Sequence, residues 1–143
     1  MQEWPLRSYL ELPALPASVR PARLYAKNLL YLWRMAALAD TVELLVSEIV
    51  TNAVRISTRI AHQQRETGQE PPVPRMRFWL TSDGQGVLIQ VWDSDPRRPR
   101  RQNVGPDAEA GRGLLLVETL STEWGCYEPG GQDGKIVWAV CAR

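Results

Sequence analysis

The chain has 143 residues, with 17 basic and 16 acidic side chains and a formal net charge of +1. This length is typical of one compact domain, and 44% hydrophobic with 23% charged residues excludes a disordered or fibrous chain. The balanced charge argues against a general polyanion binder, because such proteins depend on many basic contacts to phosphates.

The lack of long apolar segments and the small number of cysteine and histidine residues exclude several function classes. There is no run of ~18 apolar residues and no apolar signal segment in residues 1–10, so we expect a cytoplasmic protein without a membrane span. Cys126 and Cys141 are too few for a disulfide framework and are expected to be free thiols. The single histidine, His62, lies in a polar stretch, which argues against a zinc site and against Ser-His-Asp or Cys-His catalysis.

The chain begins with a predicted strand and a predicted helix. Residues 1–12 are expected to hold a short N-terminal strand or arm, followed by a linker over Pro13–Pro16. Apolar residues then recur at helical spacing over Val19–Trp33. Ser18 precedes this run and is the expected N-cap.

A second, longer helix is predicted from Asp40 to about Gln64. Asp40 and Glu43 are three residues apart, which resembles a capping box. The polar, proline-rich segment Glu66–Pro74 ends the helix. One apolar face is expected to pack on a sheet and consists of Val42, Leu45, Val46, Ile49, Ala53, Ile56 and Ile60.

Two strands with alternating side chains are predicted next, over Arg75–Ser82 and Val87–Asp93. They are joined by a hairpin turn at Asp83–Gly86. Alternation turns one set of side chains toward the helices, namely Met76, Phe78, Leu80, Val87, Ile89, Val91 and Asp93.

The last third of the chain is expected to hold a long loop, a short helix and a hairpin. The loop covers Ser94–Ala110, the apolar helix Leu114–Leu120, and the hairpin strands Glu123–Tyr127 and Lys135–Ala142. The predicted order favours one α+β domain over residues 1–143. It would be a two-layer α/β sandwich with the helices on one face of a mainly antiparallel, mixed sheet.

A polar stripe borders the apolar face of the second helix. Glu48, Asn52, Arg55 and Arg59 are spaced by four, three and four residues and are therefore helical neighbours. The stripe is either a solvated helix edge or one wall of a pocket.

Two further features allow a structural and a functional interpretation. Asp93 shares a strand face with core residues, and a buried carboxylate needs a partner; it is otherwise a plain strand-end turn residue. Gly111-Arg112-Gly113 precedes an apolar helix, where backbone N–H groups and the helix dipole attract phosphate. It is otherwise an ordinary helix-entry turn.

Together these features resemble the GHKL (histidine-kinase-like, Bergerat-fold) ATPases, over about Leu12–Ala142. SEIVTNAVRIS is similar to their N box, VWDSDPRRP to their first glycine-box region, GRGLLLVETLSTEWG to their second and GKIVWAV to their terminal strand. The nearest resemblance is to the small stand-alone RsbW-type anti-sigma-factor serine/threonine kinases common in actinobacteria.

The resemblance implies that the chain binds ATP and Mg²⁺. Glu48 would be the catalytic base for the attacking hydroxyl or water, Asn52 would bind Mg²⁺, and Asp93 would accept a hydrogen bond from the adenine amino group. Phosphate contacts would come from Arg55 and from Gly111, Arg112, Gly113 and Leu114. Ser94–Ala110 would be the ATP lid, mobile without nucleotide, with phosphate-neutralising arginines Arg97, Arg98, Arg100 and Arg101.

Two positions depart from the family pattern. The first glycine box commonly reads D-x-G-x-G, whereas the sequence here is Asp93-Ser94-Asp95-Pro96-Arg97, without either glycine. The terminal strand often carries a nucleotide-contacting threonine after its glycine, whereas Lys135 follows Gly134 here. The first departure concerns how the lid holds nucleotide, and the second concerns the adenine contacts.

The resemblance implies a kinase that acts on a small protein antagonist in transcriptional regulation and sequesters a sigma factor. The alternative is a nucleotide-dependent interaction module with little or no kinase activity. Nucleic-acid binding through Arg97–Arg101 is a third hypothesis, which the balanced net charge disfavours.

A partner surface is expected on the sheet face opposite the helices. Alternation turns Trp79 and Trp92 outward there, and exposed aromatic patches favour protein contacts, including a homodimer. In the alternative, the N-terminal segment with Trp4 and Tyr9 folds over them.

Overall fold

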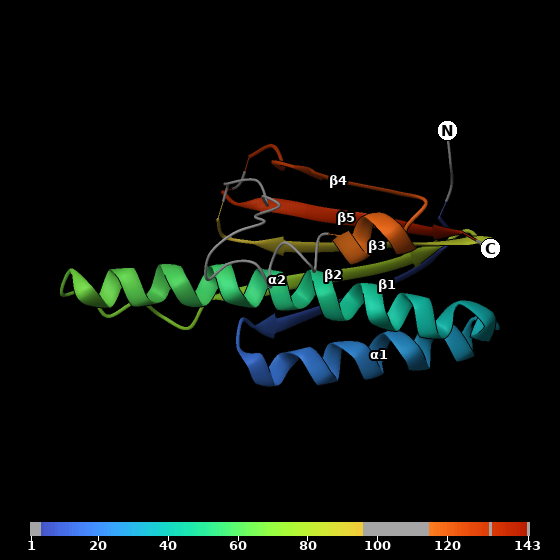
Figure 1. Ribbon diagram of the computed structural model, residues 1–143, viewed down its shortest axis with the longest axis horizontal. Helices are drawn as coiled ribbons and strands as arrows, with labels where there is room; N and C mark the ends of the chain where they lie inside the picture. The colour runs from blue at the N-terminus through green and yellow to red at the C-terminus, as the bar shows by residue number, and fades with distance from the viewer. Residues whose placement is uncertain (1–3, 96–114, 132, 143) are drawn as a thin grey trace.

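The computed structural model describes residues 4–95, 115–131 and 133–142, and these form two layers (Figure 1). One layer is an antiparallel sheet with the spatial order β1-β2-β3-β5-β4. The other contains the helices α1 (Val19–Leu32) and α2 (Ala39–Glu66), which cover one face of the sheet. The strands are β1 (Leu6–Pro13), β2 (Arg75–Ser82), β3 (Gly86–Asp93), β4 (Glu123–Tyr127) and β5 (Lys135–Ala142). The expected α+β sandwich is confirmed.

The core lies between the sheet and the helices and follows the predicted alternation. Each inward side chain of β2 and β3 is at most 1% exposed, namely Met76, Phe78, Leu80, Val87, Ile89 and Val91. Burial of each such large side chain contributes roughly 1.5–3 kcal/mol. Val117, from the helical residues 115–120, joins the same core.

The apolar face of α2 is buried as expected along its first half only. Ile56 and Ile60 are half-buried, because the C-terminal part of α2 extends beyond the end of the sheet (Figure 1). The fully covered positions are Val42, Leu45, Val46, Ile49 and Ala53.

The predicted N-cap of the first helix has the expected position, whereas that of the second does not. Ser18 stands at the N-cap position of α1, but its side chain makes no capping hydrogen bond and its backbone is already helical (φ −83°, ψ −16°). α2 begins at Ala39 with Leu38 as N-cap, so the capping box at Asp40 is wrong. A 3-10 turn over Ala36–Leu38 leads directly into α2 and leaves no extended residue for a side-chain cap. Asp40 instead lies in the first turn, where its charge is favourable to the helix dipole.

Aromatic side chains line the sheet face away from the helices. Tyr9 of β1 and Trp79 of β2 are register partners whose ring centroids lie 5.4 Å apart. Trp4 joins them along a cleft of about 450 Å³. The guanidinium carbon of Arg77 lies 4.8 Å from the ring centroid of Trp92. The tryptophans therefore face outward as predicted, and β1 partly covers Trp79, as the alternative anticipated.

No helix among the described residues combines the length and apolar character of a membrane span. Both cysteines lie in the described part of the chain. Cys126 and Cys141 are free thiols, as predicted. Cys126 pairs with Val137 of β5, and Cys141 lies four positions further along that strand. Burial raises the pKa of the Cys141 thiol.

Candidate functional site

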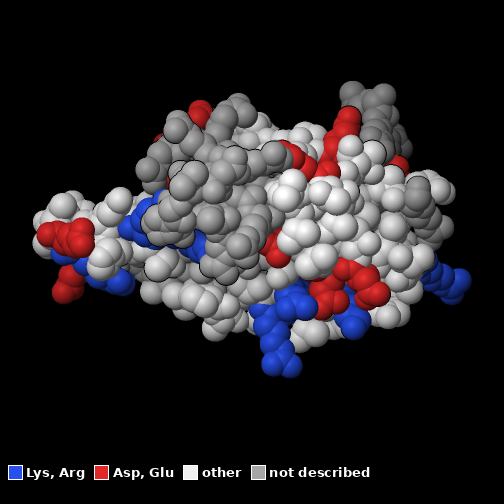
Figure 2. All heavy atoms as spheres, viewed as in Figure 1, with Lys and Arg blue, Asp and Glu red and all other residues white. Residues whose placement is uncertain are grey.

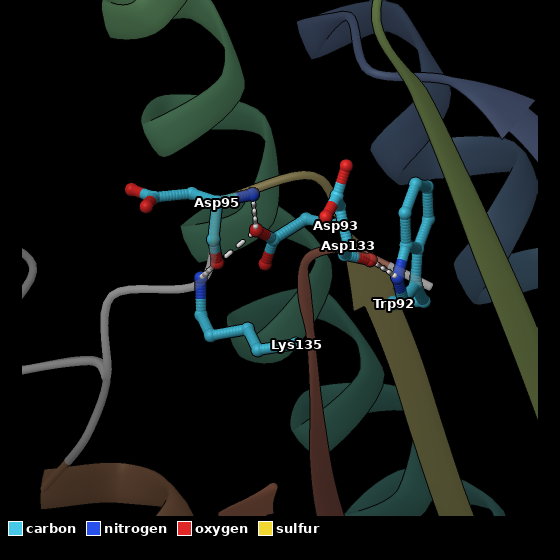
Figure 3. Close-up of polar contacts among 5 residues, drawn as sticks. All are labelled: Trp92, Asp93, Asp95, Asp133 and Lys135. Carbon is cyan, nitrogen blue, oxygen red and sulfur yellow. Dashed lines mark hydrogen bonds and ion pairs between the residues drawn. The ribbon is translucent and has the colours of Figure 1, made fainter. Parts of the chain in front are cut away.

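A buried ion pair joins the ends of β3 and β5 (Figure 3). Asp93 is the last residue of β3 and Lys135 the first of β5, and the two are register partners. The Lys135 ammonium Nζ donates to Asp93 Oδ1 at 2.8 Å. Lys135 is 0% and Asp93 1% exposed. The strand-end carboxylate is therefore a buried charge that already has one fixed partner.

Asp95 completes this cluster through its backbone. Its N–H donates to Asp93 Oδ1 at 2.9 Å, and its carbonyl oxygen accepts from Lys135 Nζ at 2.9 Å. Asp95, which stands where the glycine-box pattern has a glycine, thus contacts both Asp93 and Lys135. Both donors to Asp93 bind the same oxygen, so neither of these hydrogen bonds uses Oδ2 (Figure 3).

Glycine at position 134 allows the two strand ends to approach this closely. Gly134 has φ +93°, and a Cβ there would lie 2.2 Å from the Asp93 carbonyl oxygen. The indole N–H of Trp92 donates to the Asp133 carbonyl at 2.8 Å and fixes the same turn (Figure 3). The terminal-strand glycine therefore has a steric role that no other residue type can fill without moving the backbone.

Opposing influences act on the ionisation of Asp93. Burial is the largest and raises the pKa of Asp93 above its ordinary value. The ammonium of Lys135 and the N–H of Asp95 lower this pKa, while the Asp95 carboxylate raises it. Lys135 is thus the cation that favours the charged form of Asp93.

The polar stripe of α2 lies on the helix that packs against β3 and β5. Glu48, Asn52 and Arg55 are half-buried, whereas Arg59 is exposed. Basic groups gather over the C-terminal half of α2, which also contributes Arg65 (Figure 2). The stripe is therefore neither a core element nor a fully solvated edge.

The remaining expected site residues lie outside the described part of the chain. They are the phosphate-binding Gly111, Arg112, Gly113 and Leu114, and the lid arginines Arg97, Arg98, Arg100 and Arg101. Of the expected lid, Ser94 and Asp95 are described.

Sequence reasoning did not include Lys135 among the site residues, although a signal was present. Lys135 is the one charged residue of β5. Alternation places it on the same face as Val137, Ala139 and Cys141, all of which are buried. A lysine on a buried face implies an acidic partner, and Asp93 on the inward face of β3 is that partner.

The side chains present fit ATP with Mg²⁺ by their chemistry. Asn52 and Glu48 offer oxygen atoms on one helix face, and oxygen is the ligand type that Mg²⁺ prefers. Arg55 suits a phosphate group. The Asp93 carboxylate is an acceptor matched to an amino group.

Comparison with protein families gave one match. The model of the histidine kinase-like ATPase domain matches residues 12–141, which is nearly the whole chain. The comparison with curated proteins returned no match. The matched range contains the strand-end carboxylate, the polar stripe of α2 and all of β5 except its last residue, Ala142. The chain therefore belongs to the histidine kinase-like ATPase domain family.

Proposed function

We propose that the chain binds ATP with Mg²⁺ between α2 and the ends of β3 and β5, and that it is a regulatory serine/threonine protein kinase. The observation that supports this most directly is the buried carboxylate of Asp93 on the sheet face that α2 covers. Membership of the ATPase family supports ATP as the ligand. The partner class proposed is a small protein antagonist or a sigma factor, as for anti-sigma-factor kinases.

The proposed roles divide between α2 and the sheet. Asn52 would hold Mg²⁺, which neutralises phosphate charge when bound. Glu48 lies one helical turn before Asn52 and would accept the proton of the attacking hydroxyl or water. Asp93 would recognise the base. Such an arrangement acts by positioning and electrostatics, which is what phosphoryl transfer requires of a protein.

The second candidate function is a nucleotide-dependent interaction module. It is favoured by the two departures from the family pattern, since Asp95 and Lys135 stand where glycine and threonine are common and both contact Asp93. In this alternative, bound ATP would set the shape of a partner surface without useful phosphoryl transfer.

ATP with Mg²⁺ should raise the melting temperature of the protein. A ligand that binds only the folded state stabilises it by about 2.7 kcal/mol at 100 times Kd. Asn52→Ala should abolish most of the Mg²⁺-dependent part of the shift. Thr58→Ala, an exposed position on the same helix, is the matched control and should leave the shift intact. Thermal unfolding with ATP, ATP·Mg²⁺ or neither measures this, and an unchanged melting temperature in all three would refute nucleotide binding.

The outer sheet face is proposed as a partner or homodimer surface separate from the nucleotide site. Trp79→Ala combined with Trp92→Ala should weaken self-association or partner binding, because aromatic side chains dominate such contacts. ATP affinity should be nearly unchanged in Trp79→Ala alone, since this side chain points away from α2, whereas the Trp92 indole also holds the Asp133 turn beside the site. Sedimentation and copurification from the native host measure association. Normal association of the double variant would make this face purely structural.

A further inference from the structure

We propose that Lys135 is a positioning residue for base recognition. Its ammonium holds the Asp93 carboxylate charged and turned so that Oδ2 remains the acceptor for an amino group of the nucleobase. This inference rests on the proposed function, and it assigns a role to the residue that replaces the usual threonine of the terminal strand.

The orientation of Asp93 follows from the two hydrogen bonds to one oxygen. Lys135 Nζ at 2.8 Å and the Asp95 N–H at 2.9 Å both bind Oδ1. Rotation of the carboxylate would break both bonds together in a buried site, where unpaired polar groups are costly. The carboxylate is therefore already oriented before a ligand binds Oδ2.

Lys135 is itself fixed. Its Nζ donates to the Asp95 carbonyl as well as to Asp93, and its side chain is 0% exposed. The antiparallel register holds Lys135 opposite Asp93. Gly134, just before Lys135, packs tightly against the Asp93 backbone. The ammonium is therefore buried and held by two acceptors.

The charge of Asp93 affects how strongly it binds an amino group. An ionised carboxylate only accepts hydrogen bonds, whereas a protonated one presents an O–H donor. Burial and the Asp95 carboxylate favour protonation, and Lys135 opposes it. On α2, which packs on this face, the half-buried ionisable groups of the stripe are Glu48 and Arg55. The ammonium in hydrogen-bond contact with Asp93 is that of Lys135.

The test is the pH profile of ATP·Mg²⁺ binding, measured by titration calorimetry. Wild-type affinity should vary little between about pH 6 and about pH 8.5, because the Lys135 ammonium in contact with Asp93 favours the ionised carboxylate. Lys135→Met should bind at least about tenfold more weakly at the acidic end and recover by up to about tenfold per pH unit toward the basic end. Below the pKa of a carboxyl group, its ionised fraction grows about tenfold with each pH unit, which gives this slope.

Two matched variants separate charge from shape. Lys135→Gln keeps a hydrogen-bond donor but no charge, and it should show the same pH slope as Lys135→Met. Asp93→Asn with Lys135→Met has no ionisable group at either position and should bind weakly without a slope. Loss of affinity in Lys135→Met that is equal at every pH would overturn the proposal and leave Lys135 a structural residue.

A measurement without nucleotide distinguishes this inference from the proposed function. The carboxyl carbon of Asp93, labelled with ¹³C and assigned with the double variant, should remain in its ionised position in the wild-type protein from about pH 6 upward. Its titration midpoint should rise in Lys135→Gln. A wild-type protein in which Asp93 titrates near neutral pH would contradict the inference even if ATP binds. Absence of ATP binding with the expected carboxyl titration would instead contradict the proposed function.

Discussion

Replacing Lys135 with methionine should lower the free energy of unfolding by about 3–5 kcal/mol. Removal of one partner of a buried ion pair leaves the other charge without compensation, and Asp93 is 1% exposed. The loss is a large fraction of the 5–15 kcal/mol that is typical of a domain. Chemical denaturation at neutral pH measures it.

The double variant Asp93→Asn with Lys135→Met is the control for this loss. It removes both charges, so it should recover most of the stability, as replacement of whole buried ion pairs often does. If the double variant is as unstable as Lys135→Met alone, the loss comes from packing rather than from the unpaired carboxylate.

The cost of Lys135→Met should also depend on pH. Burial raises the pKa of Asp93, and the ammonium that opposes this is absent from the variant. A carboxyl with a raised folded-state pKa binds its proton more tightly in the folded protein. Stability is therefore highest in acid and falls as the pH rises from the ordinary value of 3.8 through the folded-state pKa. The difference between the single and double variants should shrink as the pH is lowered.

The strands could be predicted from sequence because their signal is local. β2, β4 and β5 have the predicted bounds, since alternation and turn residues determine each of them within a few positions. The same alternation predicted that Asp93 faces the core. Ser18 was correctly placed at the N-cap of α1. The capping box of α2 was wrong because α2 continues directly from a 3-10 turn, and a turn of three residues has no apolar period to detect in the sequence.

The Asp93–Lys135 pair shows where local reasoning stops. The two residues lie 42 positions apart, and their contact depends on β5 inserting beside β3 while β4 takes the sheet edge. Strand order of this kind is set by packing of the whole sheet and not by the pattern of either strand. The sequence therefore predicted the carboxylate of the candidate site and contained a signal for a buried lysine, but the pairing of the two became visible only in the structure.

Glu48→Gln should lower the rate of phosphoryl transfer by about 10²–10⁴-fold while ATP binding is retained. The substitution keeps the shape of the side chain but removes the group that would accept a proton, and a positioned base contributes a factor of that order. Glu48 is half-buried and lies on the same face of α2 as Asn52, so its loss should not disturb the core. Single-turnover transfer of labelled γ-phosphate to water, or to a protein copurified from the host, measures the rate.

The matched control for this experiment is Glu43→Gln on the same helix. Glu43 pairs with Arg23 of α1 at 3.1 Å in an exposed ion pair, which is worth at most about 1 kcal/mol. Its replacement should leave both the rate and the ATP-induced thermal shift unchanged. An equal rate in Glu48→Gln and the wild-type protein would remove Glu48 from the catalytic role. A wild-type protein that binds ATP·Mg²⁺ but transfers no phosphate to water or to its copurified partner would support the interaction module, in which the α2–β3–β5 site holds nucleotide to shape a binding surface.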